Sequence, residues 1–231
     1  MKKHLLPLVA LLVVADTALA QLETEGPFGS KVRLEVSDRM RYERFAWFET
    51  DPASATRDYD YGFFANRLQL GLRVTGEPLE FFVQYQHSLV TSIPDQSPGP
   101  GGAYYTNSPD KNQEKGILRN IWLRWKNPLG AQALSLTAGR QIFRDGLEAP
   151  STDPTLLWLQ KSRISERLIG PFDYTHVGRS FDGGQVAFDN TAMNVTGFAF
   201  TPTWGGYEIN GNRELVIGVA GVSASLKALE A

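Results

Sequence analysis

The sequence predicts an all-β fold of antiparallel strands. Three features carry that prediction: side chains that alternate in polarity with a period of two, connections that alternate between short and long, and an export signal at the N-terminus. The chain has 231 residues, with 22 Gly, 13 Pro and no Cys. A disulfide framework and a thiolate metal site are therefore excluded, so the fold has to be held together by its sheet or core.

Residues 1–20 have the parts of a secretory signal peptide. Lys2 and Lys3 precede an apolar run over residues 5–14, and Ala18-Leu19-Ala20 places small residues before Gln21. The run is too short to span a bilayer, so we expect cleavage before Gln21 and one mature domain, residues 21–231. Removing residues 1–20 leaves 21 basic and 24 acidic side chains, a balance that does not favour nucleic acid as a partner.

Period-two alternation predicts the strands. In residues 32–42, Val32, Leu34 and Val36 alternate with Arg33 and Glu35. In the fourth strand, Ile117, Ile121, Leu123 and Trp125 would share the apolar face, opposite Asn120, Trp122 and Arg124. About eight strands are expected, over residues 32–42, 64–75, 81–89, 117–126, 133–139, 185–188, 195–200 and 215–226.

Connection lengths alternate along the chain. Residues 76–79, 127–132 and 189–192 form short, turn-like links, whereas residues 49–62, 90–115, 141–180 and 201–213 are long and rich in Gly, Pro, Asp and Asn. Short turns on one rim and long loops on the other are typical of an outer-membrane barrel. The Gly-rich stretch at residues 99–102 has no helical pattern after it, and we interpret it as a flexible loop.

The strands suit a membrane because each has one apolar and one polar face. The mature chain has no apolar run near 18 residues, but a spanning strand needs only about 10. Aromatic side chains gather at the predicted strand ends, where a membrane girdle would need them: Tyr42, Phe45, Trp47, Phe48, Tyr59, Tyr61, Phe63 and Phe64 near long connections, Phe81 and Trp125 near short ones. The sequence therefore predicts an antiparallel transmembrane β-barrel of outer-membrane type.

Several segments resemble the alginate export family of outer-membrane porins. Gly139-Arg140-Gln141 closes one strand, a long loop follows, and Arg179-Ser180-Phe181-Asp182 opens the next. The segments Arg41-Tyr42-Glu43 and Ala65-Asn66-Arg67-Leu68 are also similar. The order and spacing of these segments are more specific than any one of them. By this resemblance the family motif residues are Gly139, Arg140, Gln141, Arg179, Phe181 and Asp182.

The resemblance implies a barrel of roughly eighteen strands that passes anionic polysaccharide, or small anionic or polar solutes. This chain differs in length, since it has strands for about the N-terminal half, and its last residues lack a terminal aromatic side chain. We expect a partial barrel, with an eight-stranded outer-membrane barrel as the alternative. Expected partners are outer-membrane lipid, an anionic polysaccharide or small anionic solute, and periplasmic export or assembly proteins.

Polar side chains of the inward parity are the candidate solute path. They are Arg33, Arg39, Arg41, Glu43, Arg67, Gln69, Arg73, Gln84 and Arg124, and Arg140 is added on the resemblance alone because its parity is outward. Arg outnumbers Glu in this set, and arginine rings favour anions in a pore. The opposing interpretation is that Arg and Glu on neighbouring strands pair to stiffen the wall.

Other functions fit the sequence less well. Asp173, His176 and Ser180 have the residue types of a hydrolase triad, but they crowd into one loop without a nucleophile elbow, so no enzyme activity is expected. We also expect no cofactor and no metal site. A secreted or periplasmic carbohydrate-binding β-sandwich is the alternative from another class of protein.

Overall fold

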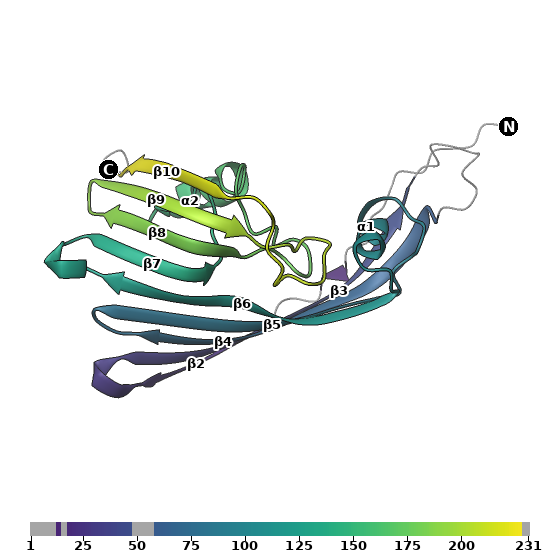
Figure 1. Ribbon diagram of the computed structural model, residues 1–231, viewed down its shortest axis with the longest axis horizontal. Coiled ribbons are helices and arrows are strands. Elements are labelled where there is room, and N and C mark those ends of the chain that lie inside the picture. The colour runs from purple at the N-terminus through teal and green to yellow at the C-terminus, as the bar shows by residue number, and fades with distance from the viewer. Residues whose placement is uncertain (1–12, 15–17, 48–57, 228–231) are drawn as a thin grey trace.

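The computed structural model describes residues 13–14, 18–47 and 58–227. They form one antiparallel sheet in which consecutive strands are neighbours from β3 to β10 (Figure 1). The strands are β1 (Val13–Val14), β2 (Ala18–Glu25), β3 (Lys31–Ala46), β4 (Asp60–Thr75), β5 (Leu79–Thr91), β6 (Asn112–Lys126), β7 (Leu134–Gln141), β8 (Phe181–Asp189), β9 (Met193–Pro202) and β10 (Val219–Leu226). All eight strands expected from the sequence are present, and the all-β prediction is confirmed.

Short and long connections alternate as expected. The 3-10 turns η1 (Pro27–Gly29) and η2 (Pro128–Gly130) and two tight turns join strands at one end of the sheet, on the left in Figure 1. The long connections leave the strands at the other end. One carries the helix α1 (Gly99–Asn107). The connection between β7 and β8 carries α2 (Pro154–Leu159), which continues into the π-helical turn η3 (Gln160–Ile164) and is drawn beside β8 to β10 in Figure 1. The interpretation of residues 99–102 as a flexible loop is wrong, because they form the first turn of α1.

The two faces of the sheet have opposite character. One face, here called the outer face, carries exposed apolar side chains on nearly every strand, including Leu34 (48% exposed), Leu70 (44%), Leu123 (47%), Val186 (47%) and Val222 (77%). The inner face carries the polar set and is covered by the long connections, so Gln86, Ser88, Asn120 and Thr137 are buried there. A water-soluble sheet has the reverse distribution.

A β-bulge in β6 changes the predicted parity of that strand. Gln84 pairs with Asn120 and Tyr85 with Leu118, so Arg119 is the extra residue. Arg119 and Asn120 are consequently both buried on the inner face. Before the bulge the alternation is inverted, so Ile117 is buried on the inner side and not on the apolar outer face as the sequence pattern predicts.

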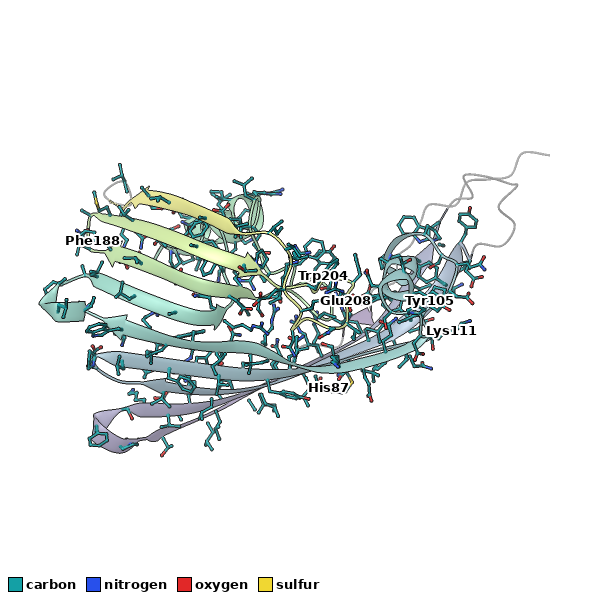
Figure 2. The ribbon with its side chains drawn as sticks, viewed as in Figure 1. His87, Tyr105, Lys111, Phe188, Trp204 and Glu208 are labelled. Carbon is teal, nitrogen blue, oxygen red and sulfur yellow. The ribbon has the colours of Figure 1, made fainter. Side chains whose placement is uncertain are left out.

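The largest apolar core lies on the inner face at the long-connection end. Phe63 and Tyr61 pack there with Tyr104 of α1, whose ring meets Phe63 edge-on with centroids 5.9 Å apart. The connection between β9 and β10, which carries Trp204 and Glu208 in Figure 2, reaches toward α1 and Tyr105, and its Tyr207 packs on Tyr104 with centroids 5.2 Å apart. A second cluster joins Phe143, Phe181 and Phe200.

These clusters correct part of the aromatic prediction. Phe45, Tyr61 and Phe63 belong to the inner cluster and not to an outward girdle. Trp47 stacks on Phe45 with ring centroids 5.9 Å apart, so it also belongs to the inner side. Tyr42 and Trp125 are exposed, as a girdle requires, whereas Phe48 lies outside the described residues. Among the described helices, none is long and apolar enough to cross a membrane.

The described sheet is open, with β10 at one edge and β1 and β2 beside β3 at the other. The predicted cleavage site before Gln21 falls inside β2, where residues 21–25 pair with residues 31–35 of β3. Cleavage there would leave these five pairs in place, and it stays a prediction.

Candidate functional site

The inner face brings nine of the ten predicted solute-path residues onto one surface. Register alone shows this, since Arg39 pairs with Arg67, Arg33 with Arg73, and Gln69 with Gln86. Gln84, Glu43 and Arg124 share the same parity on β5, β3 and β6. The central arginines are not free, however, because residues 172–178 of the connection between β7 and β8 lie against them.

Asp173 is the centre of that contact. Its Oδ1 accepts from Arg119 Nη2 at 2.7 Å and from Arg67 Nη1 at 3.2 Å, and its Oδ2 accepts from Arg144 Nη2 at 2.5 Å. Arg39 donates to the main-chain oxygen of Asp173 at 2.9 Å. We call these five residues the Asp173 cluster. Burial alone would raise the pKa of the Asp173 carboxyl, but the three guanidinium groups hold it below its ordinary value.

The residues after Asp173 are fixed to the same strands. Arg39 and Arg41 donate to the main-chain oxygens of Thr175 and Tyr174. Ser88 Oγ donates to the His176 oxygen at 2.9 Å, and Gln86 Nε2 donates to the Val177 oxygen at 2.7 Å. Side chains of β3 and β5 thereby satisfy main-chain acceptors of a segment that has no strand of its own.

His176 is buried next to an ion pair. Its Nε2 lies 3.1 Å from Glu43 Oε1 and 3.2 Å from Arg41 Nε, and Arg41 and Glu43 pair at 3.1 Å. Burial lowers the pKa of His176 to about 4, with Arg41 and Arg39 lowering it further against the opposing effect of Glu43. The imidazole is therefore neutral at neutral pH.

The short-turn half of the inner face is built from compensated charges. Arg73 pairs with Glu35 at 3.2 Å and with Glu80 at 3.0 Å, and Arg124 pairs with Glu80 at 3.3 Å. Arg33 pairs with Glu23 of β2 at 2.7 Å. These pairs fit the alternative interpretation, in which Arg and Glu on neighbouring strands stiffen the wall.

Amide side chains form the remaining polar contacts between strands. Gln69 Nε2 donates to Gln86 Oε1 at 2.7 Å, and Asn120 Nδ2 donates to Gln84 Oε1 at 2.8 Å. Asn120 Oδ1 accepts from the main-chain N–H of Ile142 at 3.1 Å, at the start of the connection after β7. Amides therefore link three strands, β4, β5 and β6, and one long connection.

Arg140 does not join the inner-face set. It pairs in register with Ile121, whose side chain is exposed on the outer face, and its guanidinium binds Asp182 at 2.6 Å and Asn212 at 2.9 Å. Its placement among the solute-path residues is therefore corrected, because no bulge in β7 reverses its outward parity.

The other residues of the family motif make contacts within the sheet and its connections. Gly139 has φ +119°, and a Cβ there would lie 2.3 Å from the oxygen of Ile121. Gln141 and Phe181 pair in register and are buried on the inner face. Arg179 lies over the ring of Phe172 at 5.8 Å.

The three residues with the side chains of a hydrolase triad do not contact one another as a triad would, because each has other partners. Ser180 Oγ donates to the main-chain oxygen of Arg119 at 2.7 Å, His176 faces Arg41 and Glu43, and Asp173 lies in its arginine cluster. Within the described residues, no group of three or more side chains is placed to hold a metal ion.

Sequence reasoning missed Arg119, Arg144 and the role of Asp173. The alternation of β6 places Arg119 on the apolar face, because a bulge cannot be recognised from alternation. In the structure Arg119 is fully buried on the inner face. Arg144 and Asp173 lie in a connection whose path depends on tertiary packing. A signal for Arg119 is the pair Arg119-Asn120, two polar residues in succession within an alternating strand.

Comparisons with known proteins gave no match: no family model, no curated protein and no solved structure is similar to this chain. The resemblance to the alginate export family accordingly stays a prediction.

Proposed function

We propose that this chain is part of an outer-membrane channel whose inner face guides anionic or polar solutes, including anionic polysaccharide. One observation carries the proposal: the sheet exposes apolar side chains on the outer face and buries polar ones on the inner face. A lipid bilayer favours this distribution and water does not. The soluble β-sandwich would need a further layer to cover the outer face.

The lengths of the strands and connections support the same proposal. Strands β3 to β6 have 13 to 16 residues, and a tilted spanning strand needs about 9 to 11. The alternation of short and long connections fits one rim facing the periplasm and the other facing outward.

The Asp173 cluster and its neighbours supply the charge that selects solutes. Five arginines, Arg39, Arg41, Arg67, Arg119 and Arg144, lie there with three carboxylates, those of Glu43, Glu166 and Asp173. Because His176 is neutral at neutral pH, two positive charges are uncompensated. An excess of arginine along the wall of a pore favours anions over cations.

A channel in lipid also needs both sheet edges paired. Unpaired strand N–H and C=O groups are costly in hydrocarbon, so open edges do not occur there. Strand β10 runs opposite to β3, but β1 and β2 already pair with the edge of β3 away from β4, and β2 runs the same way as β10. Pairing with further strands, with another copy, or with β3 after β1 and β2 have left it are the three ways to close the sheet, and the last gives the small barrel.

Fractionation and planar-bilayer recording test the proposal. We expect the chain to need detergent for extraction, to show heat-modifiable gel mobility, and to give ion channels with anion preference. Arg41→Ala and Arg67→Ala should reduce that preference, whereas Arg44→Ala, an exposed position on β3 paired with Asp60, should leave it unchanged. Recovery in the soluble fraction, or cation preference, contradicts the proposal.

A further inference from the structure

A pocket lies on the inner face between the short turns and the Asp173 cluster. It has a volume of about 330 Å³ and adjoins a second pocket of about 350 Å³, with which it shares Arg124, Ile142 and Gln185. Both volumes are in the range of small-ligand sites. We call the first pocket the amide pocket, after the side chains Gln84, Asn120, Gln141 and Gln185 that line it with Arg73 and Arg124.

Gln141 is the residue that points to a ligand. Its side chain is 4% exposed, and its Nε2 has no hydrogen-bond partner among the described residues. A buried amide donor without a partner costs about 1 to 3 kcal/mol, so such groups are normally satisfied. A ligand acceptor in the pocket would satisfy this one.

The charges at the amide pocket cancel. Arg73 and Arg124 are paired with Glu35 and Glu80 at 3.0 to 3.3 Å, which gives two positive and two negative groups. An anionic ligand would gain little from arginines already neutralised and would lie close to two carboxylates. The amide pocket therefore differs from the Asp173 cluster, where positive charge is in excess.

The pocket walls are also fixed before a ligand arrives. The guanidinium carbon of Arg73 lies 4.1 Å from the ring centroid of Phe82, and that of Arg124 lies 5.1 Å from the ring centroid of Trp122. The ion pairs and these rings together hold both guanidinium groups in one orientation. A site whose donors are already oriented loses less freedom on binding.

We infer that the amide pocket binds a neutral, hydroxyl-rich ligand, a sugar of one or two rings. A hydroxyl donates and accepts at once, and the pocket offers both kinds of partner, since amides carry a carbonyl and an NH₂ group and each ion pair carries a donor and an acceptor. An apolar ligand would leave the Gln141 donor unpaired. This inference does not require passage across a membrane.

Binding measurements on the full chain in detergent test the inference. Methyl glycosides of glucose, galactose and mannose are titrated by calorimetry, with methyl glucuronide as the anionic counterpart. We expect at least one neutral glycoside to bind, with an affinity that changes less than twofold between about 50 and 500 mM salt, because a neutral ligand is not screened. Gln141→Leu should weaken its binding about 5- to 10-fold.

Two further variants keep the test decisive. Gln132→Leu changes an exposed glutamine in the connection between β6 and β7 and should bind like the parent chain. Gln185→Leu removes a second lining amide from another strand and should weaken binding even if Gln141→Leu fails to fold. The inference is overturned if no neutral glycoside binds at about 100 mM, if both lining variants bind as the parent does, or if the glucuronide binds tighter and weakens with salt. Bilayer conductance is recorded separately, so loss of sugar binding and loss of channel activity remain distinguishable.

Discussion

Asp173→Asn should release the loop segment that covers the central arginines. The carboxylate holds Arg67, Arg119 and Arg144 at 2.5 to 3.2 Å, and Arg119 has no exposed surface at all. Each guanidinium gains about 4 kcal/mol of gross attraction at an effective dielectric constant near 20, most of which desolvation offsets. Breaking a buried pair of this kind costs about 3 to 5 kcal/mol, because the remaining charge stays buried.

Amide hydrogen exchange of residues 172–178 measures this effect directly. A local loss of about 3 kcal/mol raises exchange roughly 100-fold, and the strands β5 and β6 should change less. Asp189→Asn is the matched control, because the Asp189 side chain is half exposed and, among the described residues, forms its ion pair with Lys227, an interaction worth about 0 to 1 kcal/mol. Equal exchange in both variants would refute the reasoning.

The same carboxylate predicts a pH dependence. The three arginines hold the pKa of folded Asp173 below its ordinary value of 3.8, so its contribution to stability is present above pH 3.8 and is lost as the pH falls through the folded pKa. Segment 172–178 should open in the parent chain only in strong acid. Asp173→Asn should remove this part of the acid response.

Three other predictions test the faces, the histidine and the motif glycine. Leu70→Arg on the outer face should cost about 2 to 4 kcal/mol in a bilayer, measured by unfolding in lipid vesicles, while Gln69→Arg on the inner face of the same strand should cost less; equal costs would contradict the assignment of the faces. Burial lowers the pKa of His176 from 6.5 to about 4, so the free energy of unfolding should fall as the pH drops from 6.5 to 4. In His176→Gln this free energy, measured by urea unfolding at several pH values, should depend less on pH over that range, and an unchanged pH dependence would contradict the prediction. Gly139→Ala should cost about 1 to 3 kcal/mol by thermal unfolding, because φ is +119° and the new Cβ would meet the oxygen of Ile121, and a neutral result would mean that β7 adjusts.

The central arginines bind a loop of the same chain and are not free to line an open solute path. Arg39 and Arg41 bind main-chain oxygens of residues 173–175, and Arg67 binds the Asp173 carboxylate. In the proposed channel the surplus of positive charge would favour anions, while the loop occupies the arginines that would meet them. A solute that reaches these arginines therefore has to displace hydrogen bonds that the loop already makes.

Strand positions were predictable because alternation is a local property. Residues 32–42 and 64–75 show it clearly, and β3 and β4 extend it at their long-connection ends. The bulge at Arg119 and the helix α1 were not predictable in this way. A bulge is fixed by pairing with a neighbouring strand. Helix α1 begins with a Gly- and Pro-rich stretch, and its Tyr104 packs against Phe63, a contact that local sequence does not reveal.

The sequence by itself determined the antiparallel order of the strands, the ends at which they are joined, and the separation of apolar from polar faces, since each follows from spacings within a few residues. Only the tertiary structure decided which arginines have partners. Asp173 lies 54 residues from Arg119 and 106 from Arg67 along the chain, and their meeting depends on the path of a long connection across the sheet. Side-chain alternation carries no information about that path, because the path is fixed by burial and by hydrogen bonds to side chains that β3, β4 and β5 bring together.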